Sequence, residues 1–350
     1  MSHTSAGKLV ELHMGPADLG GDDLLVPIIR FIDGAEKYLD IAVQEIDNRE
    51  IGQAIVRARG RNVRVRVVLE ADYLRAEERR DDPWTPGGKY EINREIQNAL
   101  YRTRAHVHAD FNPEIFHQKF VVRDREAVLM GSTNFTWTGT HRNLNHLVIV
   151  HDKSVAMEYW REFNEISKGR FGKDSDPHPA APKESVVDDL RVKVLFAPDH
   201  NPEMEIIKQM AKARKRIDFA IFTFSKSSGI DDEMASKIDA GIEVRGLMDA
   251  GQGRMDWSTY DILKGLGAKV ELTKRHPDLG KLHHKLMVID GEVTITGSMN
   301  YTGPATTLND ENIMVIGKMG VTGVERTAQK KFAKYALNEI DRMIEEFGEH

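Results

Sequence analysis

Hydrophobic and polar positions follow the same plan twice along the chain. In residues 8–70, and again in residues 190–249, short runs of β-branched residues alternate with stretches whose apolar residues stand three and four positions apart. Such spacings predict amphipathic helices, and the short β-branched runs predict strands. Both stretches therefore predict strand, helix, strand, helix, strand, with α/β layers around a buried and largely parallel sheet.

The register of the two copies supports an internal duplication. Ala35 and Asp40 in the first copy stand where Ala213 and Asp218 stand in the second. Between the copies, residues 169–189 contain three prolines and little apolar periodicity, which is typical of a linker. We therefore predict a first repeat over residues 1–168, a linker over 169–189 and a second repeat over 190–350. The first repeat also carries an insertion within residues 73–105.

Composition narrows the functional classes. The length of 350 residues suits two domains of ordinary size. The absence of cysteine excludes disulfides, thiolate nucleophiles and cysteine-based zinc sites. The net charge of −6 argues against a broadly basic surface that coats nucleic acid, although a local basic site remains compatible with it. Without a signal-type segment or an apolar stretch long enough to span a bilayer, we expect a soluble, cytoplasmic protein.

One motif occurs in both repeats. The first copy is "FHQKFVVRDREAVLMGSTNFT", residues 116–136, and the second is "LHHKLMVIDGEVTITGSMNYT", residues 282–302. Each has a histidine, a lysine two positions later, an aspartate seven positions after the histidine, and a Gly-Ser-x-Asn turn. The matched residues are His117, Lys119, Asp124, Ser132 and Asn134 in the first copy and His283, Lys285, Asp290, Ser298 and Asn300 in the second.

The spacing of the motif predicts a half-site in each repeat. Alternate residues of a strand share one face, so the histidine and the lysine project together. The turn returns the asparagine to the same place. Two half-sites facing each other suit a phosphodiester, because lysines neutralise its oxygens and asparagine amides bond to them. One histidine then attacks phosphorus and the other protonates the leaving oxygen.

These paired motifs resemble those of the phospholipase D superfamily, and the resemblance covers nearly the whole chain. It implies two tandem α-β-α sandwich domains related by a pseudo-twofold axis, with the active site in the cleft between them. It further implies a metal-independent phosphodiesterase that needs no cofactor and works through a covalent phosphohistidine. The two motifs lie in one chain, so oligomerisation is not needed to complete the site.

The family also places an acidic residue about 28 positions after each histidine, where it orients the imidazole. Glu311 stands there after His283, whereas Asn145 stands there after His117. An amide stabilises an imidazolium less than a carboxylate does, which predicts a less basic His117. We therefore assign His117 as nucleophile and His283 as general acid. The reverse assignment stays open, because a carboxylate partner also strengthens a nucleophile.

Two further expectations concern residues beside the motifs. Asp124 and Asp290 should lie just behind the cleft, where the resemblance implies a structural role rather than a chemical one. His284 follows the motif histidine directly, so its side chain should point to the opposite face of the strand and have a structural role.

Three substrate hypotheses remain. Nucleic acid is favoured, because the basic segments at residues 57–67 and 212–216 are compatible with phosphate contacts. Phospholipid is the alternative substrate, and a catalytically silent binding protein on the same fold is the third possibility. The sequence offers no integral membrane segment, which leaves both substrate classes open.

Overall fold

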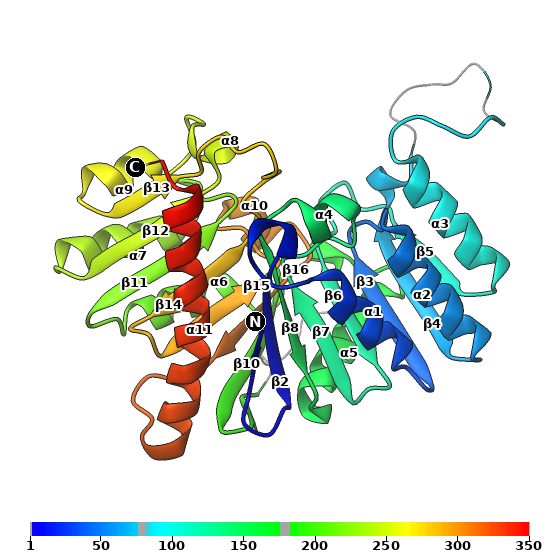
Figure 1. Ribbon diagram of the computed structural model, residues 1–350, viewed down its shortest axis with the longest axis horizontal. Helices are drawn as coiled ribbons and strands as arrows, with labels where there is room; N and C mark the ends of the chain where they lie inside the picture. The colour runs from blue at the N-terminus through cyan, green and yellow to red at the C-terminus, as the bar shows by residue number, and fades with distance from the viewer. Residues whose placement is uncertain (1, 76–81, 83, 176–182, 350) are drawn as a thin grey trace.

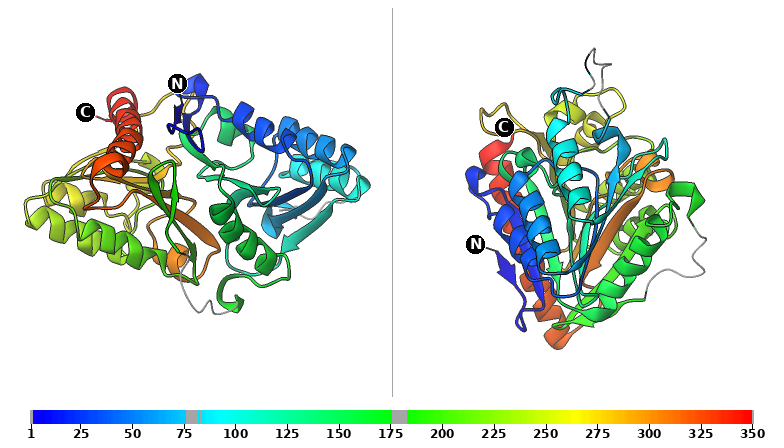
Figure 2. Two further views of the ribbon diagram at one scale, coloured as in Figure 1. Left: turned by 90° about the horizontal axis from the view of Figure 1, so that it is seen from below. Right: turned by 90° about the vertical axis from the view of Figure 1, so that its right-hand side faces the viewer.

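The computed structural model describes residues 2–75, 82, 84–175 and 183–349. Two eight-stranded sheets lie side by side, and helices cover both faces of each sheet (Figures 1 and 2). The predicted pair of tandem α-β-α sandwich domains is confirmed. Parts of the predicted insertion (residues 76–81 and 83) and of the predicted linker (residues 176–182) fall outside the described residues.

The two sheets repeat the same strand order. The first sheet has the order β1-β2-β8-β7-β6-β3-β4-β5, and the second has β9-β10-β16-β15-β14-β11-β12-β13. The strands of the first sheet are β1 (His3–Thr4), β2 (Val10–Gly15), β3 (Tyr38–Val43), β4 (Arg64–Glu70), β5 (His106–Asp110), β6 (Lys119–Arg123), β7 (Ala127–Gly131) and β8 (Asn145–Val150). Those of the second are β9 (Ser185–Val187), β10 (Leu190–Ala197), β11 (Arg216–Ile221), β12 (Glu243–Met248), β13 (Lys269–Leu272), β14 (Lys285–Ile289), β15 (Val293–Gly297) and β16 (Glu311–Ile316).

The expectation of a largely parallel sheet is wrong. Only β3, β4 and β5 pair in parallel in the first sheet, and only β11, β12 and β13 in the second. The remaining neighbours are antiparallel. Successive strands such as β6 and β7 follow one another through tight turns, and a tight turn joins only antiparallel neighbours. Both motif strands, β6 and β14, belong to this antiparallel part.

Helices complete the layers. In the first repeat they are α1 (Leu25–Asp33), α2 (Arg49–Gly60), α3 (Glu91–Arg102), α4 (Trp137–His141) and α5 (Lys153–Ile166). In the second they are α6 (Pro202–Met210), α7 (Gly229–Asp239), α8 (Ala250–Gly253), α9 (Tyr260–Gly265), α10 (Gly303–Thr307) and α11 (Gly323–Phe347). Short 3-10 turns η1 (Ala17–Leu19), η2 (Ala71–Tyr73) and η3 (Gly172–Asp174) occur between them.

Local sequence explains where two of the helices, α2 and α6, begin. The Asn48 side chain accepts hydrogen bonds from the backbone N–H groups of Glu50 and Ile51 and so caps α2. Asn201 caps α6 in the same way, and Pro202 supplies the fixed φ that suits a first helical position. The predicted insertion contributes α3, and the predicted linker contributes η3 and β9, which pairs with β10. The exact domain limits stay a prediction.

The hydrophobic core joins the two repeats. One apolar cluster combines residues of both sheets with α5 and α11, and it includes Phe120, Tyr159 and Phe196, whose rings contact one another. Two further clusters lie under α1 to α3 and under α6, α7 and α9. The shared cluster holds the two half-sites in one fixed arrangement, since buried side chains of this kind pack closely. Among the described residues, no helix is both long enough and apolar enough to cross a membrane.

Candidate active site

The backbone brings the two motifs together at the interface between the repeats. The N–H of His117 donates to the carbonyl of Asp310 at 3.0 Å, and the N–H of His283 donates to the carbonyl of Leu144 at 2.8 Å. Each motif histidine is therefore tied to the residue just before β16 or β8 of the other repeat. This crossing places the predicted half-sites opposite each other.

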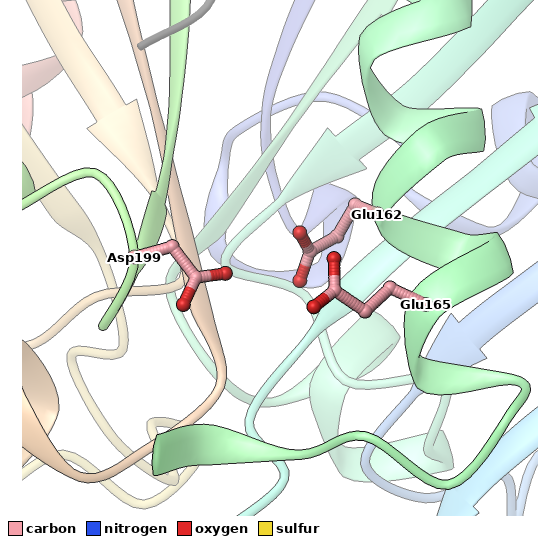
Figure 3. A group of neighbouring side chains, drawn as sticks. All are labelled: Glu162, Glu165 and Asp199. Carbon is pink, nitrogen blue, oxygen red and sulfur yellow. The ribbon is translucent and has the colours of Figure 1, made fainter. Parts of the chain in front are cut away.

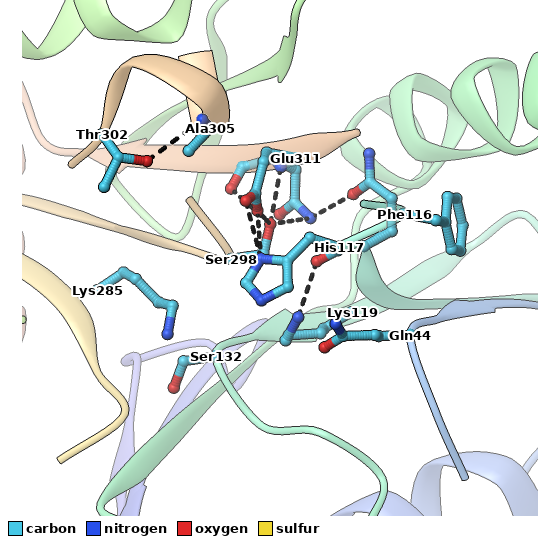
Figure 4. A network of polar contacts seen from close by, with 12 residues as sticks. Gln44, Phe116, His117, Lys119, Ser132, Lys285, Ser298, Thr302, Ala305 and Glu311 are labelled. Carbon is cyan, nitrogen blue, oxygen red and sulfur yellow. Dashed lines mark hydrogen bonds and ion pairs between the residues drawn. The ribbon is translucent and has the colours of Figure 1, made fainter. Parts of the chain in front are cut away.

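The crossing also changes the partners of the two histidines. The Glu311 carboxylate lies 2.8 Å from His117 Nδ1 (Figure 4). His283 Nδ1 lies 2.9 Å from Asn145 Oδ1 and 3.1 Å from the Ser132 carbonyl. The sequence-based pairing of Glu311 with His283 and of Asn145 with His117 is therefore wrong. Each partner is supplied by the opposite repeat, because β8 and β16 begin at the interface.

The Gly-Ser turns hold these partners in place. Ser132 Oγ donates to Asn145 Oδ1 at 2.9 Å, and Ser298 Oγ donates to the Glu311 carboxylate at 2.5 Å. A Cβ at Gly131 would collide with the carbonyl of His146, and a Cβ at Gly297 with that of Asn312. Glycine is therefore required before each serine, where two backbone segments approach closely.

The two motif lysines are buried beside the histidines. Lys119 Nζ donates to the His117 carbonyl at 2.8 Å, and Lys285 Nζ donates to the His283 carbonyl at 2.9 Å. Burial lowers the pKa of Lys119 to about 7, while the Glu311 and Glu45 carboxylates oppose that shift. Burial also lowers the pKa of Lys285, and the nearby Lys119 lowers it further. Two buried lysines, of which Lys119 lowers the basicity of Lys285, favour an anion between them rather than a metal cation.

Both histidines are held in the neutral form in the free protein. Burial lowers the pKa of His117 well below its ordinary value, and Lys119 and Lys285 add to this effect. Burial likewise lowers the pKa of His283, with further contributions from Lys285 and Lys119. Burial raises the pKa of Glu311 to about 8, although both lysines and Ser298 act in the opposite direction. A bound phosphodiester would add negative charge and so favour protonation of these groups.

The two motif asparagines are less alike than their positions suggest. Asn134 Nδ2 donates to the Glu45 carboxylate at 3.1 Å. Asn134 Oδ1 and Asn300 Oδ1 are buried without a hydrogen-bond partner among the described residues. Burial raises the pKa of Glu45 to about 7, and Asp47 raises it further. Glu45 was not foreseen, because it lies outside the repeated motif.

The motif aspartates lie away from the chemistry. Asp124 accepts hydrogen bonds from the backbone N–H groups of residues 36–38, and Asp290 accepts them from those of residues 214–216. Each aspartate directly follows β6 or β14, and each of these strands begins at a motif lysine. At the usual rise of a strand, the aspartate is about 17 Å from that lysine. The expectation that they lie just behind the cleft is wrong, since they anchor the start of β3 and β11 instead.

Two buried polar pairs cross the interface behind the histidines. Asn312 Nδ2 donates to Gln118 Oε1 at 2.7 Å. The rings of His146 and His284 stack with centroids 5.2 Å apart, and their Nδ1 atoms lie 2.9 Å from each other. Gln118 and His284 occupy equivalent motif positions, next to the histidines, so the duplication could have indicated a shared structural role.

A polar pocket adjoins the site on the side of the first repeat. It has a volume of about 450 Å³ and is lined by Gln44, Glu70, Asp72, Tyr73, Arg75, Tyr90 and Ile115. Glu70 accepts a hydrogen bond from the N–H of Phe116, the residue before His117, at 2.7 Å. In the second repeat, Phe222 packs against His283 with ring centroids 5.0 Å apart. The two sides of the site therefore differ in polarity.

A comparison with known protein families supports the assignment of two related repeats. A family model described as "Cardiolipin synthase, PLD-like domain" matches residues 28–167 and 206–336, which is more than half of the chain. The chain belongs to the phospholipase D superfamily. The matched segments contain both motifs and both crossed partners, which agrees with the resemblance drawn from the sequence.

Individual relatives cover shorter segments. The mitochondrial cardiolipin hydrolase of Canis lupus familiaris is 27% identical over 143 residues, covering 41% of this chain and 50% of the relative. A phospholipase D of Rickettsia felis is 29% identical over 128 residues, covering 37% of this chain and 56% of the relative. The chain thus spans about half the length of these curated relatives.

Among solved structures, the phosphatidylserine synthase of Haemophilus influenzae Rd KW20 shares the fold. Its TM-score is 0.65 at 13% identity, covering 97% of this chain and 88% of the other. A match at this identity supports the architecture of two tandem repeats and nothing finer.

Proposed function

We propose that the protein is a phosphodiesterase that works through a covalent phosphohistidine on His117. The observation that carries this proposal is the crossed pair of half-sites, in which two histidines, each oriented at Nδ1, lie beside two buried lysines. The phosphodiester would lie between the half-sites, with its non-bridging oxygens bonded to Lys119 and Lys285. These two histidines and two lysines also support catalysis without a metal ion or cofactor.

The first step transfers the phosphoryl group to the enzyme. His117 attacks with Nε2, because its Nδ1 is engaged by Glu311. The bond from phosphorus to the leaving oxygen breaks as the bond from Nε2 to phosphorus forms. His283 donates its Nε2 proton to the leaving oxygen. The phosphorylated imidazole carries a positive charge, which the Glu311 carboxylate stabilises.

The second step reverses the proton transfer. His283, now neutral, accepts a proton from water as the water oxygen attacks phosphorus. The bond from phosphorus to Nε2 breaks, which releases the phosphomonoester and restores His117. The Asn145 amide oxygen holds the His283 Nδ1–H throughout and adds no charge, so His283 gains and loses its proton easily.

The crossed geometry changes the reason for this assignment. Our sequence-based argument made His117 the nucleophile because it expected an amide behind that ring. The carboxylate lies there instead, so the assignment rests on the alternative argument, in which a carboxylate strengthens the nucleophile. An amide partner leaves His283 suited to proton transfer.

We propose phospholipid rather than nucleic acid as the substrate. The basic segments at residues 57–67 and 212–216 lead into β4 and β11. Both strands run toward the site, so these segments lie at the far end, about 20 Å away. Arg57 and Arg66 there pair with Asp33 and Asp40. Neither segment supports a phosphate-binding groove at the active site.

Exposed apolar side chains occur on the loops and the short helix beside the site. Phe111, which follows β5 and precedes the first motif, is 75% exposed. Trp137 begins α4 directly after the first turn and is 52% exposed, and Trp257 follows α8 and is 39% exposed. Helices α4 and α8 lie along the same edge of the molecule (Figure 1). Such side chains favour contact with a membrane surface, and two relatives carry phospholipid-hydrolase names.

A comparison of substrates tests both parts of the proposal. Wild-type protein and His117→Ala are incubated with vesicles of cardiolipin and phosphatidylcholine, with single-stranded DNA and with RNA. We expect hydrolysis of the vesicle lipid by the wild type alone. Cleavage of nucleic acid alone would overturn the lipid assignment. Inactivity of the wild type on every phosphodiester would overturn the enzyme assignment and support a silent binding protein.

The apolar loops are tested separately. Phe111→Ser and Trp137→Ser should lower the ratio of activity on vesicles to activity on a soluble p-nitrophenyl phosphodiester. Val324→Ser is the matched control, because Val324 is also exposed but begins α11, whose start lies at the opposite edge (Figure 1). An unchanged ratio in both loop variants would contradict docking to a lipid surface by these loops.

A further inference from the structure

Three carboxylates from the two repeats converge behind the active site. Glu162 and Glu165 stand three positions apart on α5, which places them on one face of that helix. Asp199 lies in the turn between β10 and α6 of the second repeat. The three carboxylates point toward one another, and one oxygen from each lies within 4.8 Å of the others (Figure 3).

One of these carboxylates has an oxygen that the protein leaves unsatisfied. Glu162 is only 3% exposed, and its Oε2 has no hydrogen-bond partner among the described residues. Its other oxygen accepts one long hydrogen bond, of 3.5 Å, from Gln118 Nε2 within the described part of the chain. A buried carboxylate oxygen without a partner costs free energy, so a ligand that binds it is expected.

A fourth acidic side chain, Asp310, lies close to this group of carboxylates. Burial raises the pKa of Glu162 well above its usual range, and the carboxylates of Asp310, Asp199 and Glu165 raise it further. Burial also raises the pKa of Asp310, whose Oδ2 is a second buried oxygen without a partner among the described residues. A cation at the centre of the group would compete with the protons that these raised pKa values favour, and would stabilise the ionised carboxylates.

We propose that Glu162, Glu165 and Asp199 bind a hard divalent cation, with Ca²⁺ the best fit. Carboxylate oxygens are the ligands that Ca²⁺ and Mg²⁺ prefer. Ca²⁺ accepts oxygen ligands at about 2.3–2.6 Å in flexible geometries, which suits carboxylates supplied by two separate elements. Mg²⁺ demands near-ideal octahedral geometry at about 2.1 Å, which suits carboxylates from a helix and a separate turn less well.

The position of the site gives the cation a structural role. Its ligands come from α5 of the first repeat and from the β10–α6 turn of the second, so the ion joins the repeats. Gln118 connects Glu162 to Asn312 and is the residue between His117 and Lys119. The cation therefore stabilises the interface that holds the two half-sites, and it touches none of the reacting atoms.

Calorimetry on protein freed of metal by EDTA and dialysis tests the site without any activity assay. CaCl₂ is titrated at neutral pH into the wild type, Glu162→Gln and Asp199→Asn, and MgCl₂ and MnCl₂ are titrated into the wild type. We expect one Ca²⁺ per chain in the wild type and an affinity at least about 10-fold lower in both variants. Glu158→Gln, on the same helix and paired with Arg161, is the matched control and should bind within about twofold of the wild type.

Thermal unfolding gives an independent readout, because a ligand that binds only the folded state raises Tm. CaCl₂ should raise the Tm of the wild type and of Glu158→Gln but not that of Glu162→Gln. Asp199→Asn, at a partly exposed position in a turn, keeps the test decisive if Glu162→Gln does not fold. Absence of both heat and a Tm shift at about 10 mM of each cation, or an equal response in Glu162→Gln, would overturn the proposal.

Discussion

At the scale of single residues, Glu311 is the group that makes the two half-sites unequal. It occupies the position that Asn145 occupies in the other repeat, and each side chain is held by the serine of its own turn. The carboxylate reaches His117 and the amide reaches His283. A near-symmetric site thereby acquires one charged and one neutral orienting group, which is sufficient to give the two histidines different roles.

This difference predicts a specific pH dependence. The pKa of Glu311 is raised to about 8, and only the ionised carboxylate accepts the Nδ1–H and leaves Nε2 of His117 free to attack. The kcat/KM of the wild type should therefore rise with pH as Glu311 ionises, and fall at higher pH as Lys119, whose pKa is about 7, loses the proton with which it binds the phosphodiester. Glu311→Gln should lower kcat/KM by at least about 100-fold and abolish this rise.

Initial rates at a series of pH values on a soluble phosphodiester check this prediction. Glu325→Gln is the control, since that carboxylate lies on α11 and pairs with Arg191. A wild-type profile without the rise, or the same rise in Glu311→Gln, would show that another group controls the dependence.

The lowered pKa of Lys119 predicts that this side chain destabilises the folded protein, although the proposed mechanism requires it. Its pKa is about 7 in the folded protein, against about 10.4 in an unfolded chain. Between pH 7 and about 10.4 the unfolded chain binds more protons at Lys119 than the folded protein does. The free energy of unfolding therefore rises with pH over this range. Below pH 7 the destabilising effect of Lys119 is complete. Lys119→Met should thus raise the free energy of unfolding at pH 6 by about 2 kcal/mol or more, and less at pH 9, while abolishing activity.

Urea unfolding in buffers free of phosphate measures this effect, because phosphate would bind the site and mask it. Lys153→Met, at an exposed position on α5, serves as the control and should change the free energy of unfolding little at either pH. A Lys119→Met variant less stable than the wild type at pH 6 would refute the argument.

At the scale of secondary-structure elements, the tight packing of β7 on β8, and of β15 on β16, positions the crossed partners. Gly131→Ala and Gly297→Ala each place a Cβ against a backbone carbonyl of the neighbouring strand. Each should lower the free energy of unfolding by about 2–4 kcal/mol, because backbone cannot move aside as a side chain can.

The matched control is Gly60→Ala at the end of α2, where a Cβ meets nothing within 4 Å. It should leave stability unchanged or raise it by up to about 1 kcal/mol. Chemical denaturation of the three variants gives the comparison. Equal stabilities in all three would mean that the turns tolerate a side chain.

At this scale the sequence predicted more of the fold than of the contacts. Repeated apolar spacing predicted the alternation of strands and helices within residues 8–70 and 190–249, because periodicity reflects burial directly. The order of strands within a sheet is a long-range property that local pattern does not encode, which is why the sheets were expected to be largely parallel.

The same limit applies to the site. The motif residues were identifiable because they recur at fixed spacing. The crossing of Glu311 and Asn145 depends on how the two repeats pack, and equivalent spacing within each repeat predicts the opposite pairing. Glu45 lies outside the duplicated motif and has Thr223 at the corresponding position of the second repeat, so nothing in the repetition indicated it.

At the scale of the whole molecule, one shared core fixes two half-sites that differ at few positions. If the side chains at positions 145 and 311 decide which histidine is the nucleophile, moving the negative charge from one position to the other should move the nucleophile. The double variant Asn145→Asp, Glu311→Gln should therefore form its phosphohistidine on His283. Peptide mapping by mass spectrometry would locate the modification. Phosphate retained on His117 would mean that the other asymmetries, such as Glu45 and Phe222, decide the nucleophile.

The most direct test of the proposed mechanism is to locate the phosphohistidine in His283→Ala, which lacks the group that activates water. A p-nitrophenyl phosphodiester suits this test, because its leaving group departs without a proton. We predict a burst of one p-nitrophenolate per chain, followed by stalled turnover, with the remaining phosphoryl ester attached to His117. His117→Ala should give no burst and no modified peptide. Phosphate on any other residue, or steady turnover by His117→Ala, would contradict the proposed mechanism.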